Sequence, residues 1–159
     1  VLEPRTSTAA NRLKAMELLA AAGVPVFAMI APVIPALNAP EIPALLRAAR
    51  EAGAVGAGYT VLRTNGPVEP LFRAWLQHHF PDRAAKVIAQ TSALHGGRMS
   101  DGRSGVRMRG EGAFALQINR LFTVMRRRIF GQSAFPALDS SGFNRPPQGQ
   151  LELFPTGQG

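Results

Sequence analysis

The chain has 159 residues, of which 46% are hydrophobic and 18% charged, and its net charge is +8. This length and apolar content suit one globular domain and argue against a wholly disordered chain. No cysteine occurs, which excludes disulfides, thiolate nucleophiles and cysteine-ligated metal sites in this chain. Neither a signal peptide nor an apolar run approaching about 20 residues is evident, so we expect a soluble, cytoplasmic protein that does not contact a membrane.

The first third of the chain predicts a helix followed by a strand. Thr6, Ser7 and Thr8 offer N-caps for a helical pattern that continues to Gly23, a residue suited to ending a helix. A short apolar run follows over residues 24–34. Because that run is apolar on both faces, we expect a buried strand.

A second helix and strand follow with short connections. Asn38 and Glu41 have capping-box spacing, so we expect Asn38 to cap a helix that ends at Gly53. Residues 54–63 resemble another strand. The order helix, strand, helix, strand predicts parallel strands covered by helices.

Beyond Arg63 the pattern predicts helices and a loop. We expect a helix over residues 67–79, with Leu71, Trp75 and Leu76 on its packed side, and a second helix that Asp82 caps and that ends near Leu94. A loop rich in Gly and Arg precedes a helix over residues 114–128. Proline, glycine, serine and glutamine dominate from residue 131, which predicts disorder.

The basic charge is concentrated in one part of the chain. Residues 91–132 carry eight arginines and two acidic residues, whereas residues 1–90 have a net charge of +3 and residues 133–159 one of −1. A concentrated cluster attracts polyanions more strongly than the same charge spread evenly. We therefore divide the chain into α/β units over residues 1–66, a helical, arginine-rich extension over 67–130 and a flexible tail over 131–159.

Six motifs occur in a characteristic order: LEPRTST, APVIPALN, AGYTVLR, EPLFRAWLQHHFPDRA, GGRMSDGRSG and RMRGEG. From Leu2 to about Arg128, the chain resembles the C-terminal half of bacterial radical SAM proteins related to spore photoproduct lyase. The resemblance implies an α/β fold that is the C-terminal part of a partial (β/α) barrel, with about two βα units, followed by helices. It also implies a lyase-like enzyme that acts on DNA or in DNA repair.

The resemblance further implies two cofactors, S-adenosylmethionine (SAM) and a [4Fe–4S] cluster held by a CxxxCxxC loop early in the barrel. That loop is missing from a chain without cysteine. We expect the chain alone to hold neither cofactor and to be inactive, and its partner to be the missing N-terminal half of the same protein.

By resemblance, four residues would bind SAM: Glu3, Arg5, Ile34 and Asn38. Ile34 would pack on the adenine, and Arg5 would pair with a carboxylate. Family members have Gly at the position of Ala36 and Asp at that of Ala39. The simpler alternatives are an N-cap at Asn38 and a solvated surface loop around Arg5.

Seven arginines are candidate contacts to nucleic-acid phosphates: Arg98, Arg103, Arg107, Arg109, Arg126, Arg127 and Arg128. Glycines allow close backbone approach, and the guanidinium fork fits phosphate. The alternatives are a solvated loop and a favourable interaction with a helix C-terminus. We predict no metal site, because His78, His79 and His95 do not have the spacing of a ligand set.

The tail contains the sequence QLELF, at Gln150, Leu151, Leu153 and Phe154. It resembles the peptide by which bacterial polymerases and repair proteins bind the sliding clamp, at the end of a Pro- and Gly-rich tether. The alternative is that these apolar residues pack on the parent domain.

Three hypotheses remain open. The chain is the C-terminal half of a DNA-acting radical SAM enzyme, a non-catalytic nucleic-acid-binding adaptor tethered to the sliding clamp, or an inactive truncated product. Because the first residue is Val1, we expect a processed product or a fragment of a longer protein.

Overall fold

A computed structural model describes residues 5–132, 136–137 and 141–142. Its elements in chain order are α1 (Ala9–Ala21), β1 (Phe27–Val33), the short 3₁₀ helix η1 (Ala39–Glu41), α2 (Ile42–Glu51), β2 (Gly56–Val61), α3 (Val68–His79), α4 (Pro81–Ala93) and α5 (Gly112–Phe130). The predicted α/β class and the order of the elements are confirmed. None of the described helices is long and apolar enough to span a membrane. Glu3, the QLELF motif and most of the tail predicted to be disordered lie outside the described residues.

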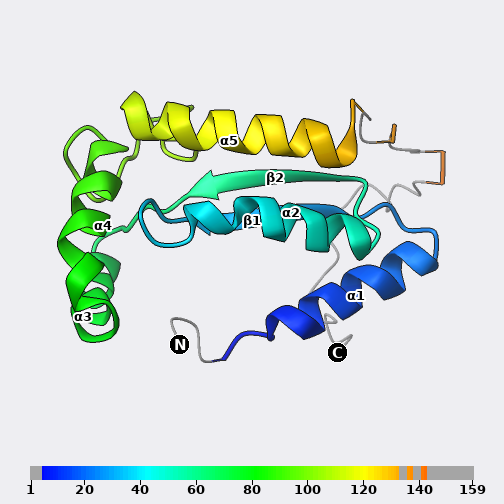
Figure 1. Cartoon of the computed structure of the whole chain (residues 1–159), viewed down its shortest axis with the longest axis horizontal. Helices are drawn as coiled ribbons and strands as arrows, with labels where there is room; N and C mark the ends of the chain where they lie inside the picture. The colour runs from blue at the N-terminus through cyan, green and yellow to red at the C-terminus, as the bar shows by residue number, and fades with distance from the viewer. Residues whose placement is uncertain (1–4, 133–135, 138–140, 143–159) are drawn as a thin grey trace, which may run out of the picture.

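β1 and β2 form a two-stranded parallel sheet, with Phe27 opposite Gly56 and Ile30 opposite Tyr59. α2 connects the two strands. Figure 1 shows α2 across the sheet, α5 and α1 on either side of it, and α3 and α4 beyond the end toward which β2 points. Loops at the carboxyl ends of parallel strands are where α/β proteins generally bind ligands, so this end of the sheet is the first place to look for a site.

The main core lies between the sheet and the helices. Ile42 and Leu46 of α2 are fully buried and pack with Tyr59 of β2 and Phe122 of α5. The Tyr59 and Phe122 rings are 4.6 Å apart between centroids. A second cluster joins α3 and α4 to the end of β1, around Phe72, Leu76 and Val87 with Ile34 and Met99. The two clusters fix α3, α4 and α5 around the carboxyl ends of the strands.

The prediction that residues 24–34 are buried on both faces is wrong. Along β1, the alternate residues Ala28 and Ile30 pack against the main core, and Val33 at the end of the strand is buried in it. On the other face Phe27 is 43% and Met29 59% exposed. Both lie over glycines of β2, because a Cβ placed on Gly58 would be 3.1 Å from the Phe27 ring and 3.3 Å from the Met29 methyl group. The helices of the described chain therefore cover one face of the sheet.

The two edges of the sheet also differ. Among the described residues β2 is the only strand that pairs with β1, so the other edge of β1 has no strand beside it. At the end of β2 the outer edge is bonded to the loop that precedes α5, where the Val61 N–H donates to the Met108 carbonyl (3.0 Å) and, just beyond the strand, the Thr64 N–H to that of Met99 (2.9 Å). The arginine-rich loop is thus part of the fold at the end of β2.

Three details of the helices differ from expectation. Leu71 is 71% exposed, and Phe72 takes the packed position with Leu76, one turn further along α3. Asp82 lies in the first turn of α4 and makes no side-chain cap. α5 continues through the three arginines to Phe130 and ends at Gly131, whose φ of 69° favours glycine. Arg126–Arg128 therefore belong to the last helical turns.

Candidate functional site

The turn after β1 is built around Asn38. Its Oδ1 accepts a hydrogen bond from the Ile34 N–H (2.7 Å), and its Nδ2 donates to the Pro32 carbonyl (3.1 Å). No side-chain cap bond is made at the helix start, so the predicted capping box with Glu41 is wrong. The amide instead ties the turn to the end of β1, because it offers both a donor and an acceptor to the two backbone groups.

The same turn holds a residue in the left-handed region. Ala36 has a φ of 58°, which costs an alanine about 1–2 kcal/mol. The conformation persists because the Ile34 carbonyl accepts from the N–H groups of Leu37, Asn38 and Ala39 at 3.1–3.3 Å. Glycine, the residue expected here from the radical SAM resemblance, would adopt this φ without strain. The turn is therefore rigid and carries local strain at the carboxyl end of β1.

A hollow of about 430 Å³ follows the open edge of β1. It is lined from three elements, by Arg12 and Leu13 of α1, Met29–Pro32 of β1, and Leu45 of α2, together with Asn38. Of the four residues expected to bind SAM, Asn38 lines this hollow, and both of its amide atoms bond to the backbone. The Ile34 side chain is 3% exposed and packs against α3 and α4, and Arg5 lies exposed before α1.

The arginine loop is organised by Arg103, which is bound by two carboxylates. Its Nε donates to Asp101 Oδ1 (3.0 Å) and its Nη2 to Asp101 Oδ2 (2.7 Å). The same Nη2 donates to Glu111 Oε1 (2.6 Å), and Nη1 donates to Glu111 Oε2 (3.3 Å). All three nitrogens of the Arg103 guanidinium are therefore engaged within the protein, so this group joins Asp101 in the middle of the loop to Glu111 at its end.

This cluster shifts two pKa values. The hydrogen bonds from the Arg103 side chain and then its backbone N–H lower the pKa of Asp101 from 3.8 to about 2. Hydrogen bonds to Asp101 and Glu111 raise the pKa of Arg103 above its ordinary value. Both groups are therefore ionised at neutral pH, and Arg103 and Asp101 form a persistent ion pair.

His95 anchors the start of the loop on β2. Its Nε2 lies 2.8 Å from the Leu62 carbonyl, so Nε2 carries the proton and donates. Its Nδ1 is buried without a hydrogen bond and lies 3.9 Å from Asp101 Oδ2. With Nε2 donating to the carbonyl, the basic nitrogen is Nδ1, which is buried beside the Asp101 carboxylate. The contacts of His95 therefore give it a structural role.

The other six arginines proposed for phosphate binding divide into two groups. Arg109 lies over the Tyr59 ring, with its guanidinium carbon 5.0 Å from the ring centroid. The side chains of the other five make no ion pair or hydrogen bond within the described residues; they belong to Arg98 and Arg107 in the loop and Arg126, Arg127 and Arg128 in α5. These five are the cations that the fold leaves available to an anionic partner.

The described residues do not fit a metal or a cluster. They contain no group of three or more His, Cys, Asp or Glu side chains that could hold a metal ion. A [4Fe–4S] cluster requires thiolate ligands, and the sequence has none. The cluster implied by the resemblance therefore has no ligand in this chain.

Sequence reasoning missed the partners of Arg103. Asp101 lies two residues before Arg103 and Glu111 eight residues after it. The presence of acidic residues so close to the arginine in one short loop was the sequence signal that could have indicated an ion pair. Comparison with known proteins returned no family model, no curated protein and no solved structure that matches this chain.

Proposed function

We propose that this chain is the C-terminal part of a radical SAM enzyme related to spore photoproduct lyase, which acts on DNA. The rest of its partial barrel would be supplied by the missing N-terminal half of the protein. The observation that carries the proposal is a parallel sheet that is covered on one face and, within the described residues, has a free edge at β1.

Parallel sheets occur almost only with both faces covered, and a sheet of two strands is marginally stable alone. β1 has a second edge, an exposed Met29 and a hollow beside it bounded by α1 and α2. One more parallel strand in that hollow would pair with the edge and be overlaid by α1. Since α1 leads directly into β1, it stands where the crossover helix from such a strand would stand.

This chain would contribute the frame of the barrel mouth and a basic surface. The turn tied by Asn38 would shape the edge of the SAM site, and residues outside the chain would hold the cluster. The five unpaired arginines at the loop and at the end of α5 would contact DNA phosphates, because their guanidinium groups have no acidic partner within the described residues.

The test uses two polypeptides. One is the 159-residue chain, and the other extends it upstream in the reading frame. Both are purified and reconstituted with iron and sulfide under anaerobic conditions, then assayed for iron and for 5′-deoxyadenosine formed from SAM. We expect cluster and product with the extended polypeptide only, and their loss when the cysteines of its CxxxCxxC segment are replaced by alanine. An upstream frame without that segment, or a cluster on the shorter chain, would contradict the proposal.

A second candidate is a nucleic-acid-binding adaptor tethered to the sliding clamp. The observation that favours it is the three successive arginines in the last turns of α5, which immediately precede the tail with QLELF. A peptide of residues 146–155 should bind purified clamp with an affinity on the order of micromolar. Replacing Leu153 and Phe154 with Ala should abolish that binding, and equal calorimetric affinities of the two peptides would exclude this mode of binding.

A further inference from the structure

A second cavity, of about 370 Å³, lies at the carboxyl end of β1 between three segments. The turn contributes Pro35, Ala36, Ala39 and Pro40, α4 contributes Lys86 and Gln90, and α5 contributes Phe114, Gln117, Ile118 and Leu121. It shares no lining residue with the hollow along β1. Its volume falls within the roughly 300–1,000 Å³ typical of small-molecule sites.

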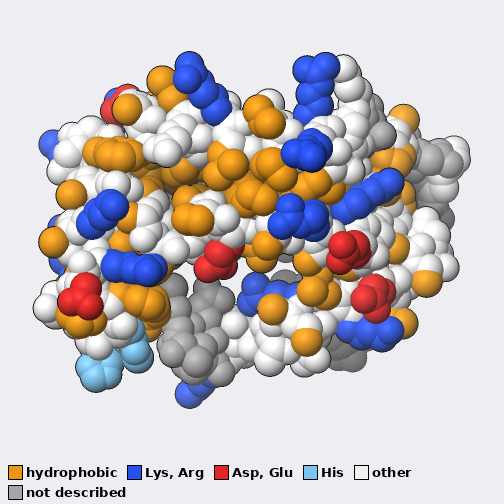
Figure 2. All heavy atoms as spheres, viewed as in Figure 1, with side chains coloured by type: hydrophobic (Ala, Val, Ile, Leu, Met, Phe, Trp, Pro, Cys, Tyr) orange, Lys and Arg blue, Asp and Glu red, His pale blue; other side chains and the backbone are white. Residues whose placement is uncertain are grey.

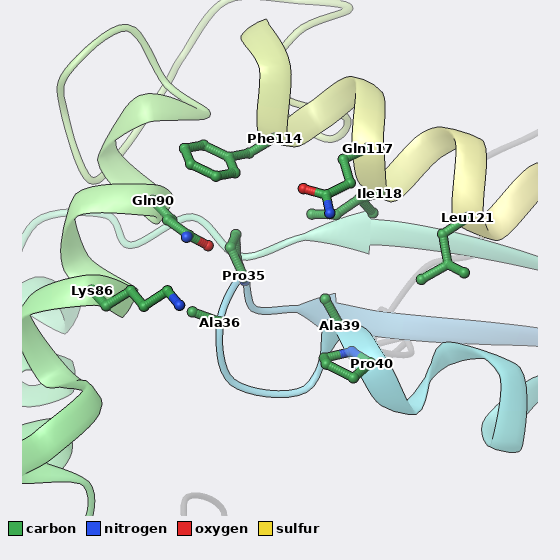
Figure 3. A pocket seen from close by; sticks show the side chains of 10 residues that line it. All are labelled: Pro35, Ala36, Ala39, Pro40, Lys86, Gln90, Phe114, Gln117, Ile118 and Leu121. Carbon is green, nitrogen blue, oxygen red and sulfur yellow. The ribbon is translucent and has the colours of Figure 1, made fainter.

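The polar groups of this cavity converge. Figure 3 shows Lys86 and Gln90 reaching from α4, and Gln117 from α5, toward the turn that holds Pro35 and Ala36. None of these three side chains makes a hydrogen bond or ion pair within the described part of the chain. Two primary amides and one ammonium group therefore face the same space with their hydrogen-bonding capacity unused.

The wall behind these groups is apolar and fixed. Phe114 supplies an aromatic ring, and Ile118, Leu121 and Pro40 supply aliphatic surface. The turn that closes the cavity is the one stiffened by Asn38 and strained at Ala36, whose φ is 58°. A strained backbone held by a network of hydrogen bonds is more frequent at ligand sites than elsewhere.

The lining excludes several ligand classes. No acidic residue lines the cavity, so it offers no partner for the ammonium group of an amino acid or for a divalent cation. The single lysine favours an anionic group. The two amides each offer a donor and an acceptor, which match the alternating donors and acceptors on the edge of a nucleobase. Phe114 offers a surface on which a base can stack.

We propose that the cavity between α4, α5 and the turn after β1 binds a nucleotide unit, with the base held by Phe114, Gln90 and Gln117 and the phosphate by Lys86. This goes beyond the proposed radical SAM activity, since it needs neither cofactor. The nucleotide comes from one of two sources, a free mononucleotide or a residue of a nucleic-acid strand, and both present the same base and phosphate.

The binding test is a set of NMR titrations of the full 159-residue chain with adenosine, guanosine, cytidine and uridine monophosphates. Adenosine and ribose 5-phosphate serve as probes that lack the phosphate or the base. We expect at least one mononucleotide to shift the side-chain amide signals of Gln90 and Gln117, and each partial probe to bind about tenfold more weakly. Equal binding by ribose 5-phosphate would overturn the role assigned to the base, and equal binding by adenosine would overturn that of the phosphate.

Two variants locate the site. Lys86→Met should lower the affinity for the mononucleotide about tenfold. Arg83→Met is the control, because it removes the same charge one turn earlier on α4 and outside the cavity, and it should leave the affinity unchanged. Gln117→Ala should weaken it as well, with Gln77→Ala on α3 as the matched control. All four positions are exposed, so the variants are expected to fold, and circular dichroism checks this.

A short single-stranded oligonucleotide separates the two sources. If the oligonucleotide displaces the mononucleotide, and this displacement is lost in the Lys86→Met variant, the site binds a nucleic-acid strand. If the oligonucleotide does not displace it, the site binds a free nucleotide. No amide shift with any mononucleotide or oligonucleotide, or equal weakening in Lys86→Met and Arg83→Met, would overturn the proposal. None of these outcomes depends on the iron and 5′-deoxyadenosine assays, so a failure here is distinguishable from a failure of the proposed function.

Discussion

On the β2 side of the sheet a loop bonds to the end of the strand, whereas on the β1 side the described residues leave the strand edge open. Beyond β2, the loop of residues 95–111 bonds to the strand end, and His95 and Arg103 hold that loop in place. Beyond β1, the described chain has a hollow and an unpaired strand edge. Both strands are rich in apolar residues, so composition alone does not separate them. The difference teaches that an apolar strand indicates a need for cover, which the described residues provide at the end of β2 and do not provide along β1.

Hydrophobic side chains are also exposed on the surface of the molecule. Figure 2 shows hydrophobic side chains forming a band across the face where α2 and α5 lie, with Lys and Arg side chains along it. On the sheet itself, Met29 is the most exposed side chain of β1 among the large hydrophobic residues. A layer packed on this face would bury Met29 and leave the basic groups at the surface.

The first prediction has the largest expected effect and compares substitutions on the two faces of the sheet by the change in the free energy of unfolding. Leu46→Ala removes a fully buried side chain from the covered face and should lower the free energy of unfolding by about 2–5 kcal/mol. Met29→Ala on the open face should change it by less than about 0.5 kcal/mol in the isolated chain. Urea denaturation of both variants measures this. Similar decreases would show that Met29 is covered within the chain, against the account.

The second prediction concerns three of the arginines that the fold leaves unpaired. Replacing Arg126, Arg127 and Arg128 with Ala should weaken binding to duplex DNA. It should also reduce the slope of log affinity against log salt by about 0.9 for each DNA phosphate that these arginines neutralise. Arg47→Ala on α2 is the control for charge at a distance. Fluorescence anisotropy at several salt concentrations gives the slopes, and a slope equal to that of the unmodified chain would show that α5 does not bind DNA.

The third prediction concerns the ion pairs of Arg103 with Asp101 and Glu111, which hold the loop at the end of β2. Arg103→Ala leaves two carboxylates without their shared cation and should lower the melting temperature and loosen the loop, because Asp101 is buried. Arg98→Ala removes an unpaired arginine from the same loop and should leave the melting temperature unchanged. Thermal denaturation compares the two variants. Equal melting temperatures would show that Arg103 contributes no more to stability than the unpaired arginines.

The fourth prediction is the smallest and follows from the lowered pKa of Asp101, about 2 against 3.8. Since the folded state holds this proton less tightly than the unfolded state, the contribution to stability is present above pH 3.8 and disappears as the pH falls toward 2. Asp101→Asn should therefore lose less stability over that interval than the unmodified chain. Urea denaturation at closely spaced pH values tests this, and parallel pH dependences would contradict it.

Local sequence patterns predicted the helices and strands well, because periodicity and end signals act within a few residues. Thr8, for example, caps α1 as expected, with its Oγ accepting from the Asn11 N–H at 3.2 Å. The burial of β1 could not be predicted in this way. Whether Met29 is covered depends on a neighbouring strand or layer, and the residue's own pattern contains no information about which chain supplies it.

The site was predicted less completely, for a related reason. Asn38 fits both an N-cap and a bridge across the turn, and the choice depends on where β1 ends in space. Arg103 has the sequence context of a phosphate ligand, and only the fold brings its two carboxylates around it. The nucleotide-sized cavity combines α4, α5 and the turn after β1, which are separated by many residues. Such convergence is a property of the packing and has no local sequence signature.

Hydrogen–deuterium exchange tests most directly the claim that the sheet is completed at β1. It is measured for the 159-residue chain and for the polypeptide extended upstream in the reading frame. The account predicts that exchange of the β1 amides slows strongly in the extended polypeptide, because a new strand occupies the open edge, while the amides at the outer edge of β2 change little. Equal exchange of β1 in the two polypeptides, or slowing confined to β2, would contradict it.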